Sequence, residues 1–233
     1  MTRDDGTQVA QLLSEGKYNL PMFLRYLKAS SMEGDQPDKS LLLGILLQSL
    51  ARFQTSDFTA CMCLVPSHVQ DSPSVEKELN YIYGLENLLS CGLFARFWTQ
   101  WSSVKEHLPE SFHFEARVRT SILETICITM ESIPTEKLAT YLAVSPDQVQ
   151  KVVHNAMKDS EDRDMKVMAY DSGSVVFHRN RFNYPQAGAA QDAIRFTDVS
   201  SVIHNDVPRR GASAAADEPR DVRARTWARM ADE

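Results

Sequence analysis

The segment TEKLATYLAVSPDQVQKVVHNAM, residues 135–157, predicts two short helices joined by a tight turn. Ser145 is suited to cap the second helix, because its hydroxyl can accept a hydrogen bond from a free backbone amide of the first turn. Pro146 fits the first helical position, and Gln148 can reach back toward the cap. One face of that helix carries apolar residues at helical spacing: Val149, Val152, Val153 and Ala156. Two short helices in this arrangement form a helix-turn-helix.

Two short apolar runs follow, one on each side of a turn sequence. Lys166-Val-Met-Ala-Tyr170 and Val175-Val-Phe-His-Arg179 flank Asp171-Ser-Gly-Ser174. Gly173 can supply the positive φ that a hairpin turn needs. A helix-turn-helix followed by a β-hairpin is a winged helix, so we predict a small α+β winged-helix domain at residues 134–185.

Upstream of this domain, apolar residues at helical spacing predict a series of short helices. Leu41–Phe53 is apolar on most of its surface, which is typical of a helix that neighbours cover on several sides. Thr55, Ser56 and Asp57 offer capping side chains for a helix from Phe58 to about Val65. A further helix begins near Val75 and is expected to stop at Gly92.

An aromatic stripe and one long helix complete this upstream region. Phe94, Phe97, Trp98 and Trp101 are spaced for core or inter-helix packing, and Phe112–Ile133 predicts a long helix with one buried face. Short helices joined by short turns favour antiparallel pairs stacked in a right-handed array. The expected fold is therefore mainly α, with a right-handed helical-repeat (HEAT/TPR-like) domain at residues 7–133 before the winged helix.

The chain beyond the winged helix divides into two parts. Residues 186–205 are expected to hold a linker and a closing helix, in which Val199, Val202 and Ile203 are apolar. Residues 206–233 contain no Leu, Ile or Phe, but seven alanines, six acidic residues and six arginines. Such a segment buries too little apolar area to stay ordered alone, so we predict a disordered tail.

Composition narrows the classes of protein to which the chain can belong. Its net charge of −6 and pI near 5.6 lack the basic excess of most nucleic-acid-binding domains. The four cysteines lie in apolar helical patterns without zinc spacing, which predicts buried, reduced thiols. The polar N-terminus resembles no signal peptide, and no apolar run approaches the ~20 residues that span a bilayer. We expect a cytoplasmic protein with no membrane association.

Motifs for catalysis or cofactor binding are missing from the sequence. It contains neither phosphate-binding glycine pattern, no G-x-S-x-G elbow and no H-E-x-x-H pair. The six histidines are scattered, without carboxylates or cysteines at ligand spacing. We therefore expect no catalytic residue, no metal site, no cofactor and no enzymatic activity.

The winged helix leaves open whether it contacts nucleic acid or protein. A recognition helix presents polar and basic side chains to base edges, and the second helix offers Lys151, His154 and Lys158. Residues 135–185, however, carry seven basic and seven acidic side chains. A nucleic-acid-binding regulator stays an alternative, but the charge balance favours protein pairing, in which the hairpin edge can add to a partner's sheet.

The most specific motif of the helical part is Ser56-Asp-Phe-Thr-Ala-Cys-Met-Cys-Leu-Val65, followed by Tyr81-Ile-Tyr-Gly-Leu-Glu-Asn-Leu-Leu-Ser-Cys91 and Phe94-Ala-Arg-Phe-Trp98. These segments resemble subunit K of eukaryotic translation initiation factor 3. Ala169–Phe177 resembles that family's wing, and Thr197–Ile203 its closing helix. The likeness runs from about Val9 to His204, and the tail has no counterpart.

The resemblance implies a non-catalytic subunit at the periphery of that factor. It implies pairing with other subunits, subunit L above all, and binding to the small ribosomal subunit through the complex; direct RNA contact stays open. Sibling subunits of the proteasome lid or signalosome, which share the architecture, are alternatives. The expected partner contacts lie in the hairpin and the closing helix: Val167, Ala169, Val175, Phe177, Val199, Val202 and Ile203.

Overall fold

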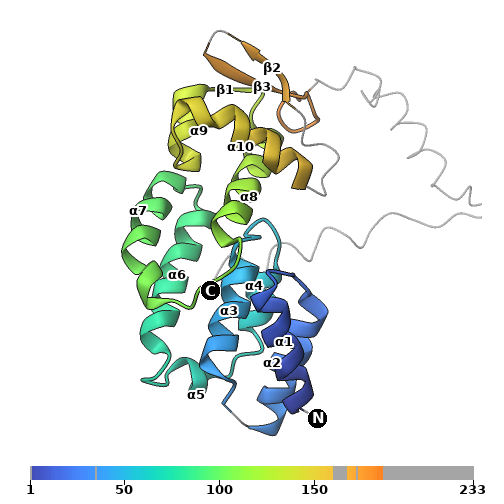
Figure 1. The fold of residues 1–233 in the computed structure, drawn as a ribbon, viewed down its shortest axis with the longest axis vertical. Coiled ribbons are helices and arrows are strands. Elements are labelled where there is room, and N and C mark those ends of the chain that lie inside the picture. The colour runs from blue at the N-terminus through green and yellow to red at the C-terminus, as the bar shows by residue number, and fades with distance from the viewer. Residues whose placement is uncertain (1, 35, 160–166, 172, 186–233) are drawn as a thin grey trace, which may run out of the picture. The chain divides into compact units, whose positions relative to one another are not determined.

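Helices form the first part of the chain, and a small sheet follows them. The computed structural model describes residues 2–34, 36–159, 167–171 and 173–185 (Figure 1). In chain order its elements are α1 (Thr2–Ser14), α2 (Leu20–Glu33), α3 (Lys39–Leu50), α4 (Asp57–Met62), α5 (Ser67–Gln70), α6 (Glu76–Ser90), α7 (Phe94–Val104), the 3-10 helix η1 (Lys105–His107), α8 (Phe114–Thr129), β1 (Ser132–Pro134), α9 (Thr135–Leu142), α10 (Pro146–Asp159), β2 (Val167–Asp171) and β3 (Ser174–Phe177). A mainly helical chain with a small three-stranded antiparallel sheet agrees with the predicted fold class. No helix in these ranges is long and apolar enough to cross a membrane.

Helix α3 is the most deeply buried element of the helical part. Every residue from Leu42 to Leu50 is buried, as the apolar run predicts. Neighbours on several sides explain this burial, since α3 packs against α1, α2, α4 and α6. At its start, one carboxylate oxygen of Asp38 accepts hydrogen bonds from the backbone amides of Ser40 and Leu41, at 2.8 and 3.1 Å. This cap satisfies two of the amides that a helix leaves without a partner.

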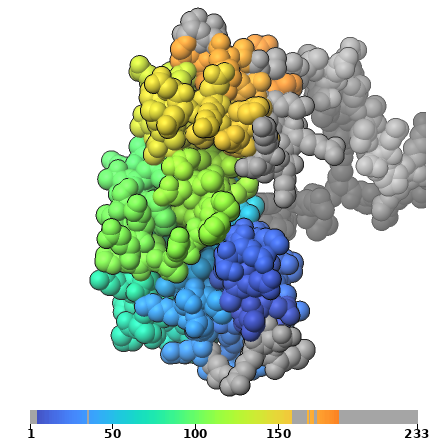
Figure 2. Space-filling model, viewed as in Figure 1, coloured from blue at the N-terminus to red at the C-terminus, as the bar shows by residue number. Residues whose placement is uncertain are grey.

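Packing among the helices is mostly local along the chain. Helix α1 contacts α2 and α3, and α6 contacts α7. In the space-filling view the colours change in bands from blue to orange, so segments close in sequence are also neighbours in space (Figure 2). The predicted stop at Gly92 is confirmed: its φ of +71° lets the Leu93 amide donate to the carbonyl oxygen of Leu88 at 2.8 Å. Local packing of this kind is typical of helical-repeat proteins.

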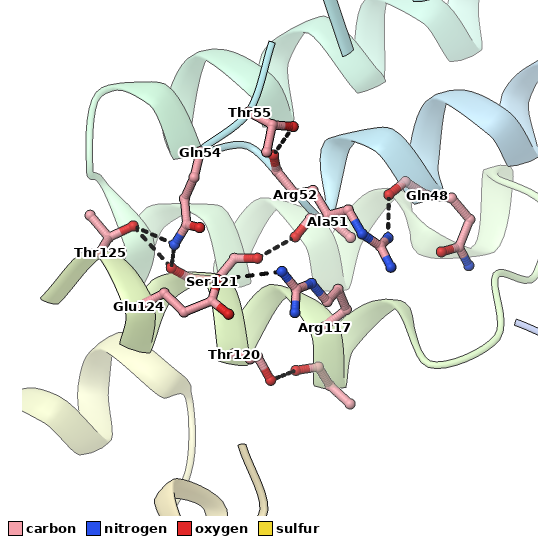
Figure 3. A network of polar contacts seen from close by, with 11 residues as sticks. Gln48, Ala51, Arg52, Gln54, Thr55, Arg117, Thr120, Ser121, Glu124 and Thr125 are labelled. Atoms are coloured by element: carbon pink, nitrogen blue, oxygen red, sulfur yellow. Dashed lines mark hydrogen bonds and ion pairs between the residues drawn. The ribbon is translucent and has the colours of Figure 1, made fainter. Parts of the chain in front are cut away.

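A polar seam attaches α8 to the end of α3 and the turn after it (Figure 3). The Ser121 hydroxyl donates to the carbonyl oxygen of Ala51 at 2.7 Å. The Gln54 amide donates to the carbonyl oxygen of Ser121 and, at 3.1 Å, to the Thr125 hydroxyl. These side chains define the polar seam, and they join segments about 70 positions apart. Because the bonds form between partly buried groups, the seam fixes the position of α8 on α3.

The prediction of a helix over the whole of Phe112–Ile133 is wrong at both ends. The helix starts at Phe114 and ends at Thr129, and Met130 already has extended backbone dihedrals. Ser132–Pro134 instead forms β1, in which Ile133 pairs with Val175 of β3. This pairing joins residues about 40 positions apart, and local apolar spacing carries no information about such a partner.

Helix α4 is shorter than the sequence predicts. It ends at Met62 rather than near Val65, because the amides of Leu64 and Val65 bond three residues back in tight turns. Ser56 occupies the N-cap position, but its side chain makes no capping bond. The Thr55 hydroxyl accepts from the Asp57 amide at 3.4 Å, so the polar triplet supplies a turn and only a weak cap.

Two of the four cysteines contradict the prediction of buried thiols. Cys61 and Cys127 are buried, and burial raises the pKa of the Cys61 thiol. Cys63 and Cys91 are exposed. Both exposed residues occupy the C-cap position of a helix, α4 and α6 respectively, where the chain turns away from the apolar face.

Candidate functional site

The winged helix is built on a small apolar core that α9, α10 and the sheet share. Helix α9 ends where Ala143 adopts a left-handed conformation with a φ of +51°, which lets the Val144 amide bond to the carbonyl oxygen of Ala139 at 3.0 Å. Helix α10 then begins at Pro146, as predicted. The buried core residues are Ile133, Leu138, Ala139, Leu142, Val149, Val153, Ala156, Val175 and Phe177.

The sheet has the strand order β1-β3-β2, so β2 lies at an edge. The predicted hairpin forms, and Gly173 has a φ of +93° in its turn. A register shift between Val167 and Ala169 interrupts the pairing of β2 with β3. Within the described residues β2 pairs only with β3, so its outer edge presents backbone groups to which another strand can bond.

Of the four expected partner contacts in the hairpin, two are buried and two are accessible. Val175 and Phe177 are 0% and 1% exposed, so their side chains belong to the core and lack a surface for a partner. Val167 is half-buried and Ala169 is exposed, which leaves these two available. The remaining expected contacts lie outside the described residues: Val199, Val202 and Ile203.

A groove of about 270 Å³ runs between α10 and the edge strand β2. Among its described lining residues no Asp, Glu, Lys or Arg occurs; they are Gln150, His154, Met157, Val167, Ala169 and Tyr170. Tyr170 is 46% exposed. The burial of its remaining surface raises the pKa of the phenol, so the side chain stays neutral. A groove without fixed charge beside an open strand edge suits a protein partner with mixed apolar and polar side chains.

The expected nucleic-acid contacts are only partly brought together. Lys151 and His154 are exposed on α10, and His154 also lines the groove, whereas the Lys158 side chain lies outside the described part of the chain. Asp147 occupies the first turn of α10, the part of a recognition helix that approaches base edges. A carboxylate there repels phosphate, so this face fits duplex DNA poorly.

The helical part holds the winged helix through two side chains of α7 and α8. The Trp98 indole donates to the carbonyl oxygen of Tyr141 at 2.8 Å, and Arg119 Nε donates to that of Leu142 at 2.9 Å. The Arg119 guanidinium also lies 4.7 Å from the centre of the Trp98 ring. The aromatic stripe is buried as predicted, but this attachment to the end of α9 was not foreseen from its spacing.

The groove residues Tyr170 and Met157 were also missed in the sequence. Both belong to predicted elements, but the expected partner contacts included neither Tyr170 of the hairpin nor any residue of the second helix. The position of Tyr170 on an edge strand was the available signal, since aromatic side chains are enriched at protein interfaces. Across the ranges that the structure describes, no cluster of His, Cys, Asp or Glu could hold a metal ion.

Comparison with known proteins places this architecture among related subunits. The model of the CSN8/PSMD8/EIF3K family matches residues 38–162, more than half of the chain. The chain is 26% identical to eukaryotic translation initiation factor 3 subunit K of Yarrowia lipolytica over 204 residues, covering 84% of this chain and 82% of the relative. It is 26% identical to the subunit K of Danio rerio and 28% identical to that of Homo sapiens, each over 189 residues and at least 80% of both chains. The chain therefore belongs to the CSN8/PSMD8/EIF3K family.

Proposed function

We propose that this chain is a non-catalytic subunit of eukaryotic translation initiation factor 3 in the cytoplasm, in the position of subunit K. The relatives that carry this name align over both the helical part and the winged helix, which supports a shared role. The observation that carries the docking role is the open edge of β2 beside the uncharged groove. A strand of a partner can add to this edge while its side chains enter the groove.

The proposed partners are other subunits of the factor, with subunit L as the direct neighbour. Contact with the small ribosomal subunit follows through the assembled complex. The bonds from Trp98 and Arg119 to the end of α9 support this role, because they hold the winged helix in a fixed orientation. A surface that is already ordered loses less conformational entropy when it binds.

Affinity purification of the tagged full-length chain from eukaryotic cytosol tests this proposal. We expect the other subunits of the initiation factor to be recovered in near-equal amounts. Tyr170→Ala should lower that recovery, because it removes the aromatic wall of the groove. Tyr83→Ala is the matched control, since Tyr83 is 37% exposed on α6, away from the groove. Recovery of only proteasome-lid or signalosome subunits would contradict the proposal.

A further inference from the structure

A recess of about 430 Å³ lies where the loop before α8 meets the ends of α1 and α3. Its described lining contains two arginines and a histidine but no carboxylate: Gly16, Gln48, Arg52, Phe112, His113, Ala116, Arg117 and Thr120. Two other recesses of similar size in the helical part each include glutamates in their walls. A cationic recess is therefore a specific local feature of a chain whose net charge is −6.

Arg52 is held in a defined orientation at this recess. Its guanidinium lies 3.7 Å from the centre of the Tyr18 ring, and Nη1 donates to the carbonyl oxygen of Gln48 at 3.1 Å. The Tyr18 hydroxyl in turn donates to Asp57 at 2.5 Å. Burial, followed by this hydrogen bond, raises the pKa of Tyr18 far above its usual range, so the ring stays neutral. A guanidinium stacked on an aromatic face is ordered before any ligand arrives.

Arg117 has hydrogen-bonding capacity that the described residues do not use. Its Nη2 atom donates to Glu124 at 3.3 Å, next to the polar seam (Figure 3). Its Nε atom is buried and has no hydrogen-bond partner among the described residues. A guanidinium carries five N–H donors, and a buried donor without an acceptor costs free energy. The Arg117 guanidinium therefore has more N–H donors than its bond to Glu124 uses, and an oxyanion is the kind of acceptor that suits them.

The backbone around the recess is arranged to bring two loops together. His113, the N-cap residue of α8, has a φ of +58°, which is unfavourable for a residue other than glycine. Gly16 has a φ of +65°, and a Cβ there would lie 3.1 Å from His113 Cδ2 and 3.2 Å from Phe112 Cβ. The N-terminus of α8 adds a partial positive charge to the same place. At the recess, therefore, the loop at Gly16 approaches the loop at His113, the backbone of His113 is strained, and the N-terminus of α8 adds positive charge.

We propose that this recess binds an acidic side chain from a partner subunit of the complex, with Arg52 and Arg117 as the paired donors. Phe112, 51% exposed at the rim, would pack against an apolar residue next to that acid. The volume suits a short stretch of polypeptide, since pockets for whole organic ligands measure roughly 300–1,000 Å³. Each guanidinium is a planar fork of N–H donors that matches the geometry of a carboxylate. The inference rests on the proposed function, which supplies the partner.

Ala116→Glu in the full-length chain is the direct test. Ala116 is exposed, lines the recess and lies in the first turn of α8, where a glutamate suits the helix. Ala95→Glu is the matched control, because Ala95 is exposed in the first turn of α7 and lines no described recess. In competition with the untagged wild-type chain, Ala116→Glu should enter the complex about tenfold less well, because like charges repel at the contact. Ala95→Glu should compete as the wild type does.

A photo-crosslinking amino acid in place of Phe112 gives a second readout, because a crosslink to a partner cannot result from a loss of stability. The expected product joins this position to a peptide of another subunit, with Asp or Glu within a few residues of the link. A link to RNA, a link to a peptide without an acidic residue, or no link overturns the inference. Equal incorporation of Ala116→Glu and Ala95→Glu also overturns it and leaves the proposed function standing. If the wild-type chain fails to enter the complex, both proposals fall.

Discussion

Helix α3 and strand β2 differ most in how much of their surface neighbours cover. Nine consecutive residues of α3 are buried, and helices pack on several of its sides. In the part of the chain that the structure describes, strand β2 pairs with one neighbouring strand, and its residues Ala169 and Tyr170 are exposed. Nearly all of the surface of α3 is buried inside the fold, whereas β2 has an exposed surface to which a partner can bind.

Because of this difference, we expect α3 to contribute mainly to the stability of the fold and β2 mainly to the binding of a partner. Removal of atoms from α3 leaves a cavity that surrounding helices fill only in part, so its cost appears in the free energy of unfolding. Removal of atoms from the exposed side of β2 leaves water where a side chain was, so its cost appears in binding. Substitutions in the two elements should therefore affect different measurements.

The largest expected effect on stability is that of Leu46→Ala in α3. Leu46 is 0% exposed, and truncation of such a residue costs about 2–5 kcal/mol. Tyr170→Ala, which removes more atoms from β2, should cost less than about 1 kcal/mol because half of that side chain already contacts water. Urea unfolding followed by circular dichroism gives both values. Equal losses of stability would show that the contrast between α3 and β2 is wrong.

A smaller effect is expected at the cap of α3. Asp38→Ala should cost about 1 kcal/mol at neutral pH, because two backbone amides lose their acceptor. Asp38→Asn, which keeps a side-chain oxygen, should retain most of that stability. If the two variants lose equal stability, the side-chain acceptor is not what stabilises the start of α3.

The same residue gives a pH dependence with a defined sign. Hydrogen bonds, first of all from the Ser40 hydroxyl, lower the pKa of Asp38. The ionised carboxylate therefore stabilises the fold above the pKa that Asp38 has in the unfolded chain, about 3.9. This stabilisation is lost as the pH falls through the lower pKa of the folded state. The difference between the wild type and Asp38→Ala, measured by unfolding at pH 7 and below pH 4, should shrink at the acidic end.

Local patterns predicted the helices and the hairpin well. The all-round apolar run at Leu41–Phe53 covers most of α3, although the helix ends at Leu50, and Gly173 adopts the positive φ of the predicted turn. These features depend on residues a few positions apart. Strand β1 was missed because its formation depends on pairing with β3, distant in the sequence. The exposed Cys63 and Cys91 were misjudged because helix ends are harder to locate than helices.

The candidate site was only partly predictable for the same reason. The hairpin and the possibility of strand addition followed from the order of elements. Which of its apolar residues face a partner depends on how the core packs, and this packing buries Val175 and Phe177 and leaves Val167 beside the groove. The cationic recess was not foreseen, because Arg52 and Arg117 meet only after α3 and α8 pack together.

Hydrogen–deuterium exchange of the chain, free and in the assembled complex, tests the central claim most directly. Amides on the outer edge of β2 should exchange rapidly in the free chain and at least about tenfold more slowly in the complex, because strand addition gives them acceptors. Amides within α3 should exchange slowly in both states. Unchanged exchange across β2 in a complex that contains the chain would contradict docking through this edge.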